Sequence, residues 1–216
     1  PDWDKVGATF TQDVHDFEVM KIRLLNGGHQ IIANAGELLS LNTIAECMSH
    51  PKVRRLFDKV ARQEILPHVK AVPGMTPDAY IDLITKRFSN PRIVDTARRV
   101  AFDGSSRHPG FVIPSIHDGL AKGTDVSGLA LVEAIWARMC AGQREDGSEI
   151  APNDPFWDQL QPLAIAAKSD PLIWLEQRQY YGFLSDAPAF AQSFANWLAL
   201  IWDHGTEATI DHYLAG

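Results

Sequence analysis

Apolar side chains recur every three or four positions in the first long stretch of the chain, residues 16–41. This spacing places them on one face of an α-helix, where they can be buried against the rest of the protein. The pattern therefore predicts one long amphipathic helix over 16–41. Its apolar positions are Phe17, Met20, Leu24, Leu25, Ile31, Ile32, Leu38 and Leu39.

Prolines mark the boundaries of the other helices that the pattern predicts. Proline has no amide hydrogen, so it ends a helix or occupies the first turn, often after Ser, Thr, Asp or Asn. Residues 103–109, read DGSSRHP, predict a break between two helices. The expected helices are about 49–66, 76–88, 90–102, a short one after Pro114, 127–143, three that start near Asp154, Asp170 and Asp186, and 206–214.

Strand signals are almost absent, because no alternating run of β-branched residues reaches a useful length. The run Phe111-Val112-Ile113 is short and stops at a proline. We therefore expect an all-α fold of about nine or ten helices, with short connections, that forms a single domain over residues 1–216.

Composition and charge exclude several classes of protein. The 216 residues carry a formal net charge of −7, and the basic residues are scattered, which argues against binding to nucleic acid. The apolar stretch 190–202 is too short to span a membrane, which takes roughly 20 residues. Cys47 and Cys140 stand far apart and predict reduced thiols in a cytoplasmic protein.

Several common site motifs are missing from the sequence. No GxGxxG, GxxxxGK[ST], HExxH or GxSxG pattern occurs, so we find neither a dinucleotide fingerprint nor a nucleophile elbow. The eight histidines show no zinc-ligand spacing, and we expect no metal site.

One polar group of residues interrupts the long helix, in the stretch KIRLLNGGHQ. On an ideal α-helix, Lys21 and His29 would lie roughly 80° apart around the axis and about 12 Å apart along it, with Asn26 between them. Gly27 and Gly28 weaken a helix by about 1 kcal/mol each, which fits a place where something approaches the backbone closely. The three polar ends could line an elongated substrate. Alternatively, Lys21 reaches solvent, Asn26 caps a neighbouring group and His29 is an ordinary core histidine.

The order of several short motifs favours the first interpretation. The pattern K-x4-N-x2-H, in this order with the others, resembles the long-chain mannitol dehydrogenase family of polyol dehydrogenases and hexuronate reductases. The resemblance covers essentially the whole chain but only the family's C-terminal helical domain, so it implies an N-terminal NAD-binding Rossmann domain that this chain lacks. The other matching segments are DFEVM at 16–20, VPG at 72–74, RFSNP at 87–91, DGSSR at 103–107 and Pro114.

The resemblance also implies roles for individual residues. Lys21 would be the general acid/base, and apolar neighbours could lower its pKa into a useful range. Asn26 would stabilise charge on the reacting oxygen, and His29 would bind a substrate hydroxyl. Arg99 and Arg107 would hold hydroxyls or a carboxylate, although helical phase does not decide between Arg98 and Arg99. The cofactor would be NAD or NADP, with no metal.

Three functions remain open on the sequence. The first is a secondary-alcohol dehydrogenase that interconverts a polyol and a ketose, as mannitol and fructose. The second is a reductase of hexuronates such as fructuronate or tagaturonate. The third is a helical domain for dimerisation or interaction with no catalytic role.

Overall fold

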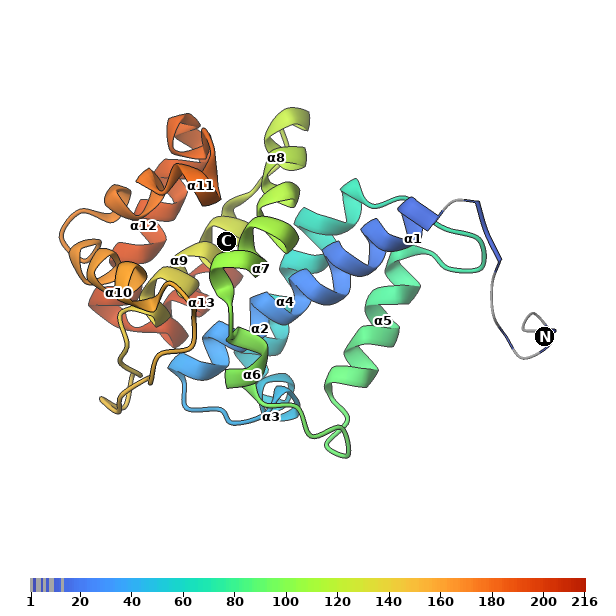
Figure 1. The fold of residues 1–216 in the computed structure, drawn as a ribbon, viewed down its shortest axis with the longest axis horizontal. Coiled ribbons are helices and arrows are strands. Elements are labelled where there is room, and N and C mark those ends of the chain that lie inside the picture. Colours follow the sequence, from blue (N-terminus) through green and yellow to red (C-terminus); the bar gives the residue numbers. More distant parts are fainter. Residues whose placement is uncertain (1, 3–4, 6, 8–9, 13) are drawn as a thin grey trace.

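The computed structural model describes residues 2, 5, 7, 10–12 and 14–216, and the described part of the chain is all-α (Figure 1). It contains no strand, and only three isolated β-bridges join neighbouring loops. The predicted fold class is confirmed. The helical segments are more numerous than the nine or ten expected, because short helices fill several predicted connections.

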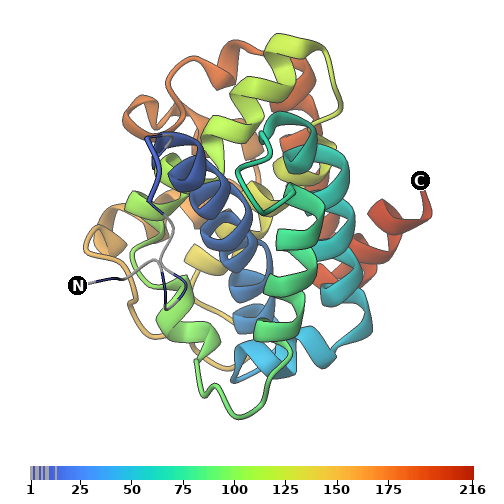
Figure 2. The same cartoon turned by 90° about the vertical axis from the view of Figure 1, so that its right-hand side faces the viewer.

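The predicted long helix forms as one continuous rod through the middle of the molecule. It consists of α1 (Val14–Met20), a π-helical turn η2 (Lys21–Asn26) and α2 (Gly27–Leu38). The backbone of Ser40 is left-handed, with φ of 59°, and the helix has ended before it. Every residue of α2 except His29 is buried, and α5 and α6 flank the rod on opposite sides (Figures 1 and 2).

A second buried helix organises the C-terminal half. It is α9 (Ser127–Cys140), buried at every position after Ser127 and packed against α2, α4 and α12 (Pro188–His204). The apolar stretch 190–202 lies in α12 and turns Phe190, Phe194 and Leu198 into the core. No helix in the described part of the chain has both the length and the hydrophobicity to cross a membrane.

The helices between residues 44 and 88 follow the predicted boundaries closely, apart from one addition. The helix expected from 49 is α4 (Pro51–Val60), extended by the π turn η3 (Ala61–Ile65) and the 3-10 turn η4 (Leu66–His68). α5 (Pro77–Phe88) has the expected bounds, and Thr76 caps it by accepting the amide of Ala79. Before α4 comes a helix that was not predicted, α3 (Ile44–Ser49), which is capped by Thr43.

Two predictions in the middle of the chain are wrong. The helix expected over 90–102 is only α6 (Ala97–Ala101), because the Asn90 side chain accepts the amide of Arg92 and fixes a turn instead. The expected break at 103–109 is helical, as α7 (Gly104–Phe111). Its first turn is capped by Asp154, whose carboxylate accepts the amide and the hydroxyl of Ser105 at 2.8 Å each.

The remaining predicted starts agree with the structure to within a few residues. They correspond to α8 (Ile113–Lys122), α10 (Trp157–Ala166), the 3-10 turn η5 (Pro171–Glu176), α12 and α13 (Thr206–Ala215). The short helix α11 (Arg178–Tyr181) and the 3-10 turn η6 (Leu184–Asp186) were not predicted.

Candidate active site

The turn that carries Lys21 is a π turn, which changes the geometry expected for this helix. The amide of Gly27 bonds to the carbonyl of Ile22, five residues back, where an α-helix would bond four residues back. In an α-helix, Lys21 and Asn26 would lie about 140° apart around the axis. The wider turn lowers the rotation per residue, so Lys21 and Asn26 lie much closer to one face than they would in an α-helix. The smaller rotation per residue also brings His29 closer to that face than the roughly 80° of the ideal helix.

The two glycines after this turn accommodate other parts of the protein. A Cβ on Gly27 would lie 3.1 Å from the carbonyl oxygen of Phe111, at the end of α7. A Cβ on Gly28 would lie 2.8 Å from the Phe57 ring, closer than real contacts allow. The close approach that the glycines predicted is therefore made by α4 and α7, which lock the rod in place beside the polar residues.

His29 lies half-buried in a small pocket of about 90 Å³ between α2, α3 and α5. Its ring stacks on Phe88, with centroids 4.2 Å apart. Burial lowers the pKa of His29 to about 4; the carboxylate of Asp95 opposes this shift, while Arg99, Arg107 and Arg87 reinforce it. The imidazole is therefore neutral near pH 7, and one ring nitrogen can donate a hydrogen bond while the other accepts one.

Arg99 and Arg107 lie close enough to His29 for their charges to act on it. Exposed Arg99 donates from Nε to Asp95 at 2.6 Å, and its Nη2 also pairs with that carboxylate. Half-buried Arg107 donates from Nη1 to the carbonyl of Val100 at 2.6 Å. Both arginines line a second pocket of about 470 Å³ with Phe102.

Arg98 and Arg99 are both exposed and both line the 470 Å³ pocket, but they have different hydrogen-bond partners. Arg98 donates to the carbonyls of Ala151 and Pro152, each at 3.0 Å, and so ties down the loop after α9. It is not among the charges that shift His29. Of the two neighbours, Arg99 is the one that belongs to the surroundings of His29.

Lys21 is exposed, in contrast to the enclosed surroundings expected for it. Met20 and Leu24 are buried beneath it, so apolar side chains cover only one side of the residue. Asn26 is half-buried. Within the described residues, the domain thus brings His29, Arg99 and Arg107 together, and presents Lys21 and Asn26 at the open surface of the same rod.

Asp95 and Phe88 belong to this site and were missed in the sequence. Asp95 stands four residues before Arg99, a spacing at which opposite charges attract on a helix, so this pair had a signal. Phe88 lies in the RFSNP segment, but nothing in the sequence shows that its ring covers His29.

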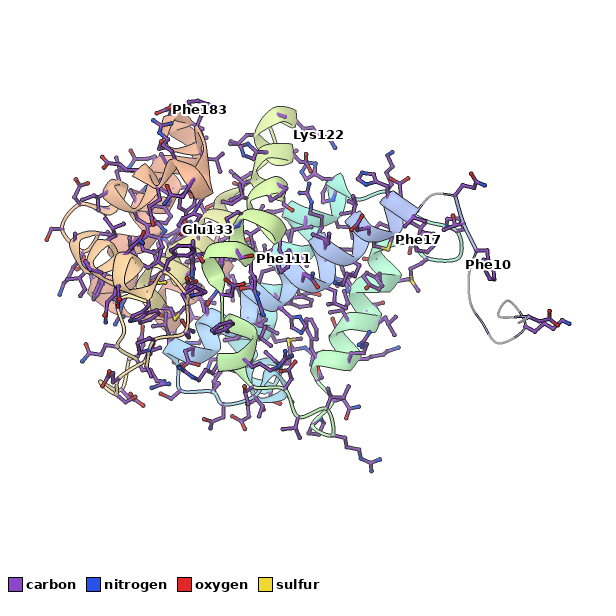
Figure 3. All side chains as sticks on the ribbon, in the orientation of Figure 1. Phe10, Phe17, Phe111, Lys122, Glu133 and Phe183 are labelled. Carbon is purple, nitrogen blue, oxygen red and sulfur yellow. The ribbon has the colours of Figure 1, made fainter. Side chains whose placement is uncertain are left out.

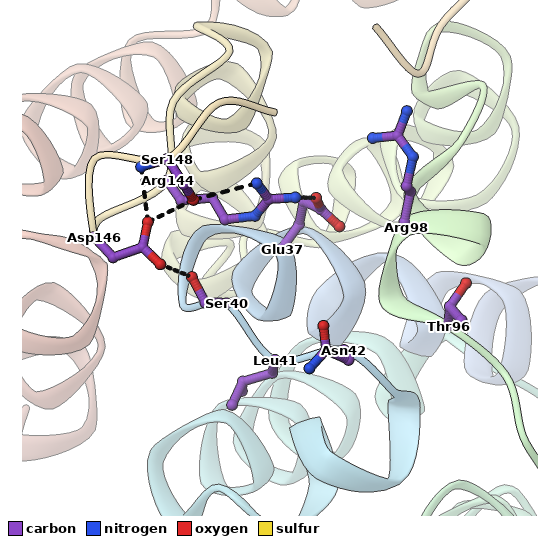
Figure 4. Close-up of a pocket in the computed structure, with 9 residues that line it drawn as sticks. All are labelled: Glu37, Ser40, Leu41, Asn42, Thr96, Arg98, Arg144, Asp146 and Ser148. Carbon is purple, nitrogen blue, oxygen red and sulfur yellow. Dashed lines mark hydrogen bonds and ion pairs between the residues drawn. The ribbon is translucent and has the colours of Figure 1, made fainter. Parts of the chain in front are cut away.

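A larger and more polar pocket of about 500 Å³ lies at the C-terminal end of α2 (Figure 4). Each of its charged groups already has a partner within the protein. Arg144 pairs with Glu37, and Asp146 accepts hydrogen bonds from the hydroxyls of Ser40 and Ser148 at 2.6 Å each. These contacts attach the loop after α9 to α2. We therefore infer that the residues of this pocket stabilise the fold and do not bind the substrate.

In the described part of the chain, no three His, Cys, Asp or Glu side chains lie close enough together to hold a metal ion.

Comparison with known proteins places this arrangement in a family. The family model of the mannitol dehydrogenase C-terminal domain matches residues 13–202. This chain belongs to the mannitol dehydrogenase family. Among curated members, it is 45% identical over 215 residues to mannitol 2-dehydrogenase of Cereibacter sphaeroides and 32% identical over 217 residues to mannitol 2-dehydrogenase of Pyrenophora tritici-repentis.

Solved structures of mannitol dehydrogenase relatives share the fold. The chain superimposes with a TM-score of 0.92 and 32% identity on the Pseudomonas fluorescens mannitol 2-dehydrogenase, whose structure is a ternary complex with NAD and D-mannitol. It superimposes with a TM-score of 0.89 and 25% identity on a D-sorbitol dehydrogenase in substrate-free form. The whole chain is covered by the first match, but it spans only 44% of that protein and 45% of the Cereibacter enzyme.

Proposed function

We propose that this domain supplies the substrate-binding and proton-transfer residues of an NAD-dependent secondary-alcohol dehydrogenase that interconverts a polyol and a ketose, as mannitol and fructose. The observation that carries the proposal is the π turn, which sets Lys21 and Asn26 on one face just before His29. Similarity to mannitol 2-dehydrogenases along the whole chain supports it.

In this proposal Lys21 is the general acid/base. The neutral amine takes the proton from the substrate hydroxyl during oxidation, and the ammonium returns it during reduction. Asn26, one π turn away, donates a hydrogen bond from its amide to the same oxygen and stabilises the charge that develops there. The domain thus handles the oxygen and its proton on one helix face.

His29 and the two arginines orient the rest of the substrate. Neutral His29 exchanges hydrogen bonds with a hydroxyl, which suits a polyol, whose hydroxyls both donate and accept. Arg99 and Arg107 donate to more distant hydroxyls. Holding the substrate at several points fixes the reacting carbon relative to Lys21, which is a large part of the advantage of an enzyme site.

The cofactor would be bound mainly by a Rossmann domain N-terminal to these residues. The described part of this chain has no strand, so it offers no βαβ unit to hold a dinucleotide, and we derive no step from residues that would contact it. NAD or NADP supplies the hydride acceptor or donor. That domain would also cover exposed Lys21.

Two further properties belong to the same proposal. The reaction would need no metal, because Lys21 and Asn26 perform the proton transfer and charge stabilisation that a metal would otherwise provide. The protein would work in the cytoplasm, where buried Cys47 and Cys140 stay reduced.

Reduction of a hexuronate is the second candidate, favoured by the arginines near His29. A substrate carboxylate needs a cation in the pocket, and three arginines are available: Arg87, which lines the His29 pocket, and Arg99 and Arg107 beside it.

Activity of the complete protein tests the proposed function. Residues 1–216 would be compared with the same residues joined to the N-terminal half of the Cereibacter sphaeroides enzyme, or to their native N-terminal half. We expect the joined protein to reduce NAD with mannitol and the isolated domain to be inactive. A joined protein that folds and binds NAD but oxidises no polyol would refute the proposal.

A further inference from the structure

Asp95 stands at the junction between the pocket of His29 and the guanidinium of Arg99. Its carboxylate lines the His29 pocket and binds both Nε and Nη2 of Arg99. The Asp95 side chain is 19% exposed, whereas that of Arg99 is 67% exposed. The aspartate is therefore the fixed member of the pair, and it decides where the arginine lies.

The backbone around Asp95 is also held in place. The carbonyl of Asp95 accepts the amide of Ile44 at 2.9 Å, and Thr96 caps α6 by accepting the amide of Arg99 at 3.1 Å. These bonds attach the segment to α3 on one side and to α6 on the other. Replacing the carboxylate by an isosteric amide would leave both bonds intact.

Charges near His29 are unequal in number. Arg87, Arg99 and Arg107 place positive charge near the imidazole, and among the described residues the main carboxylate that opposes them is Asp95. The hydrogen bond from Arg99 lowers the pKa of Asp95 further below its usual range, so the carboxylate is ionised at neutral pH. The negative charge of Asp95 thus offsets the positive charge of Arg99 beside the His29 pocket, where we expect the substrate to bind.

Arg99 would bind a substrate carboxylate most strongly through two parallel hydrogen bonds from one edge of the guanidinium. That edge, formed by Nε and Nη2, is already occupied by Asp95, and a second carboxylate would also be repelled by the first. An uncharged hydroxyl suffers no such repulsion, and it can use the remaining Nη1 or the imidazole of His29. Specificity of this kind depends on an unfavourable contact with the wrong substrate.

We infer that Asp95 is a specificity-determining residue, which keeps Arg99 from binding a carboxylate and so selects neutral polyols and ketoses over hexuronates. This inference rests on the proposed function, because it concerns the substrate of the same site. Asp95 acts through Arg99 and takes no part in proton transfer.

The test compares the reduction of fructose with that of fructuronate by NADH, using the complete protein. In each reaction the ketone takes up a hydride and a proton. The variants are Asp95→Asn, Arg99→Gln and both together. Asp186→Asn is the matched control, because Asp186 also binds one arginine, Arg178, through a forked pair. It lies beside α11, at the opposite end of the molecule from α5, near labelled Phe183 (Figure 3).

We expect Asp95→Asn to raise the ratio of kcat/KM for fructuronate over fructose by about tenfold or more, mainly through a lower KM for fructuronate. The double variant should lose this gain, because Arg99 provides the new binding site. Asp186→Asn should leave the ratio unchanged. Should Asp95→Asn fail to fold, Asp95→Ser, which also removes the charge, takes its place.

Equal effects of Asp95→Asn on both substrates would overturn the inference, because a structural role changes both alike. Persistence of the gain in the double variant would also overturn it. Failure of the unaltered complete protein to act on any polyol or ketose is a different result, since it would count against the proposed function itself.

Discussion

The imidazole of His108 and the carboxylate of Glu133 lie 2.7 Å apart in the interior, and neither side chain has any exposed surface. Asn34 on α2 donates to Nε2 of His108 at 3.0 Å, so Nδ1 carries the proton that goes to Glu133. The hydroxyl of Tyr181 donates to the other carboxylate oxygen at 2.9 Å. This buried network joins α2, α7, α9 and α11, and His108 directly follows Arg107 of the site.

We predict that Glu133→Ala destabilises the protein strongly, by about 3–5 kcal/mol, because it leaves the buried groups of His108 and Tyr181 without their partner. Glu133→Gln keeps the shape and one acceptor, so it should lose clearly less. Urea unfolding of both variants measures the difference. Equal and small losses would show that the network contributes little to folding.

Gly28→Ala tests the packing that holds the central rod. The new Cβ would lie 2.8 Å from the Phe57 ring, so we expect a loss of about 1–3 kcal/mol from overpacking. Gly110→Ala in α7 is the control, because nothing lies within 4 Å of its added Cβ. There the better helix propensity of alanine should leave stability unchanged or raise it by up to about 1 kcal/mol. Similar thermal unfolding of the two variants would contradict the packing argument.

The pKa of His29 predicts how acid affects stability. Because folding lowers it to about 4 from the ordinary 6.5, the unfolded chain binds a proton more readily than the folded one between these values. His29 should therefore weaken the fold as the pH falls from about 6.5 to about 4. In His29→Gln, the free energy of unfolding should fall less over this range, whereas His204→Gln, at an exposed position, should resemble the unaltered protein. An NMR titration midpoint of His29 near 6.5 would contradict the prediction.

Glu64 predicts the opposite trend at higher pH. It caps α9 by accepting the amides of Gly128 and Leu129, and it also accepts the hydroxyl of Tyr213. Burial raises the pKa of Glu64 to about 7 from the ordinary 4.5, so the folded protein holds this proton more tightly than the unfolded chain. The resulting stability is present in acid and is lost as the pH rises through about 7.

Glu64→Gln should remove this loss, since an amide does not titrate. We expect the difference in unfolding free energy between the variant and the unaltered protein to change between pH 4.5 and 7.5 by on the order of 3 kcal/mol at most. Glu176→Gln, at an exposed position, is the control and should keep the original pH dependence. A pH-independent difference for Glu64→Gln would show that its carboxyl does not titrate in this range.

Much of the fold could be predicted because local signals coincide with tertiary packing. Thr76 followed by Pro77 both caps and starts α5, and the apolar repeat of residues 16–38 marks the face that is buried. Prediction failed where a distant residue decides the local structure. The start of α7 depends on Asp154, some fifty positions later in the sequence, and no local pattern around Gly104 contains that information.

The candidate site shows the same division. Lys21, Asn26 and His29 were selected by motif and order, but a period of 3.6 residues could not predict that a π turn would align the first two. The contact of Asp95 with Arg99 had a visible spacing of four residues, whereas its place in the His29 pocket follows from the packing of α3 and α5 around it. Sequence order selected the candidate groups, and three-dimensional packing determined their surroundings.

The central claim is that Lys21 transfers the proton, and turnover by Lys21→Ala in the complete protein tests it most directly. We expect kcat for mannitol oxidation to fall by about 10²- to 10⁴-fold, while the dissociation constant for NAD stays the same. Added small primary amines should restore part of the rate, because they replace the missing base. Near-normal kcat in Lys21→Ala would contradict the account.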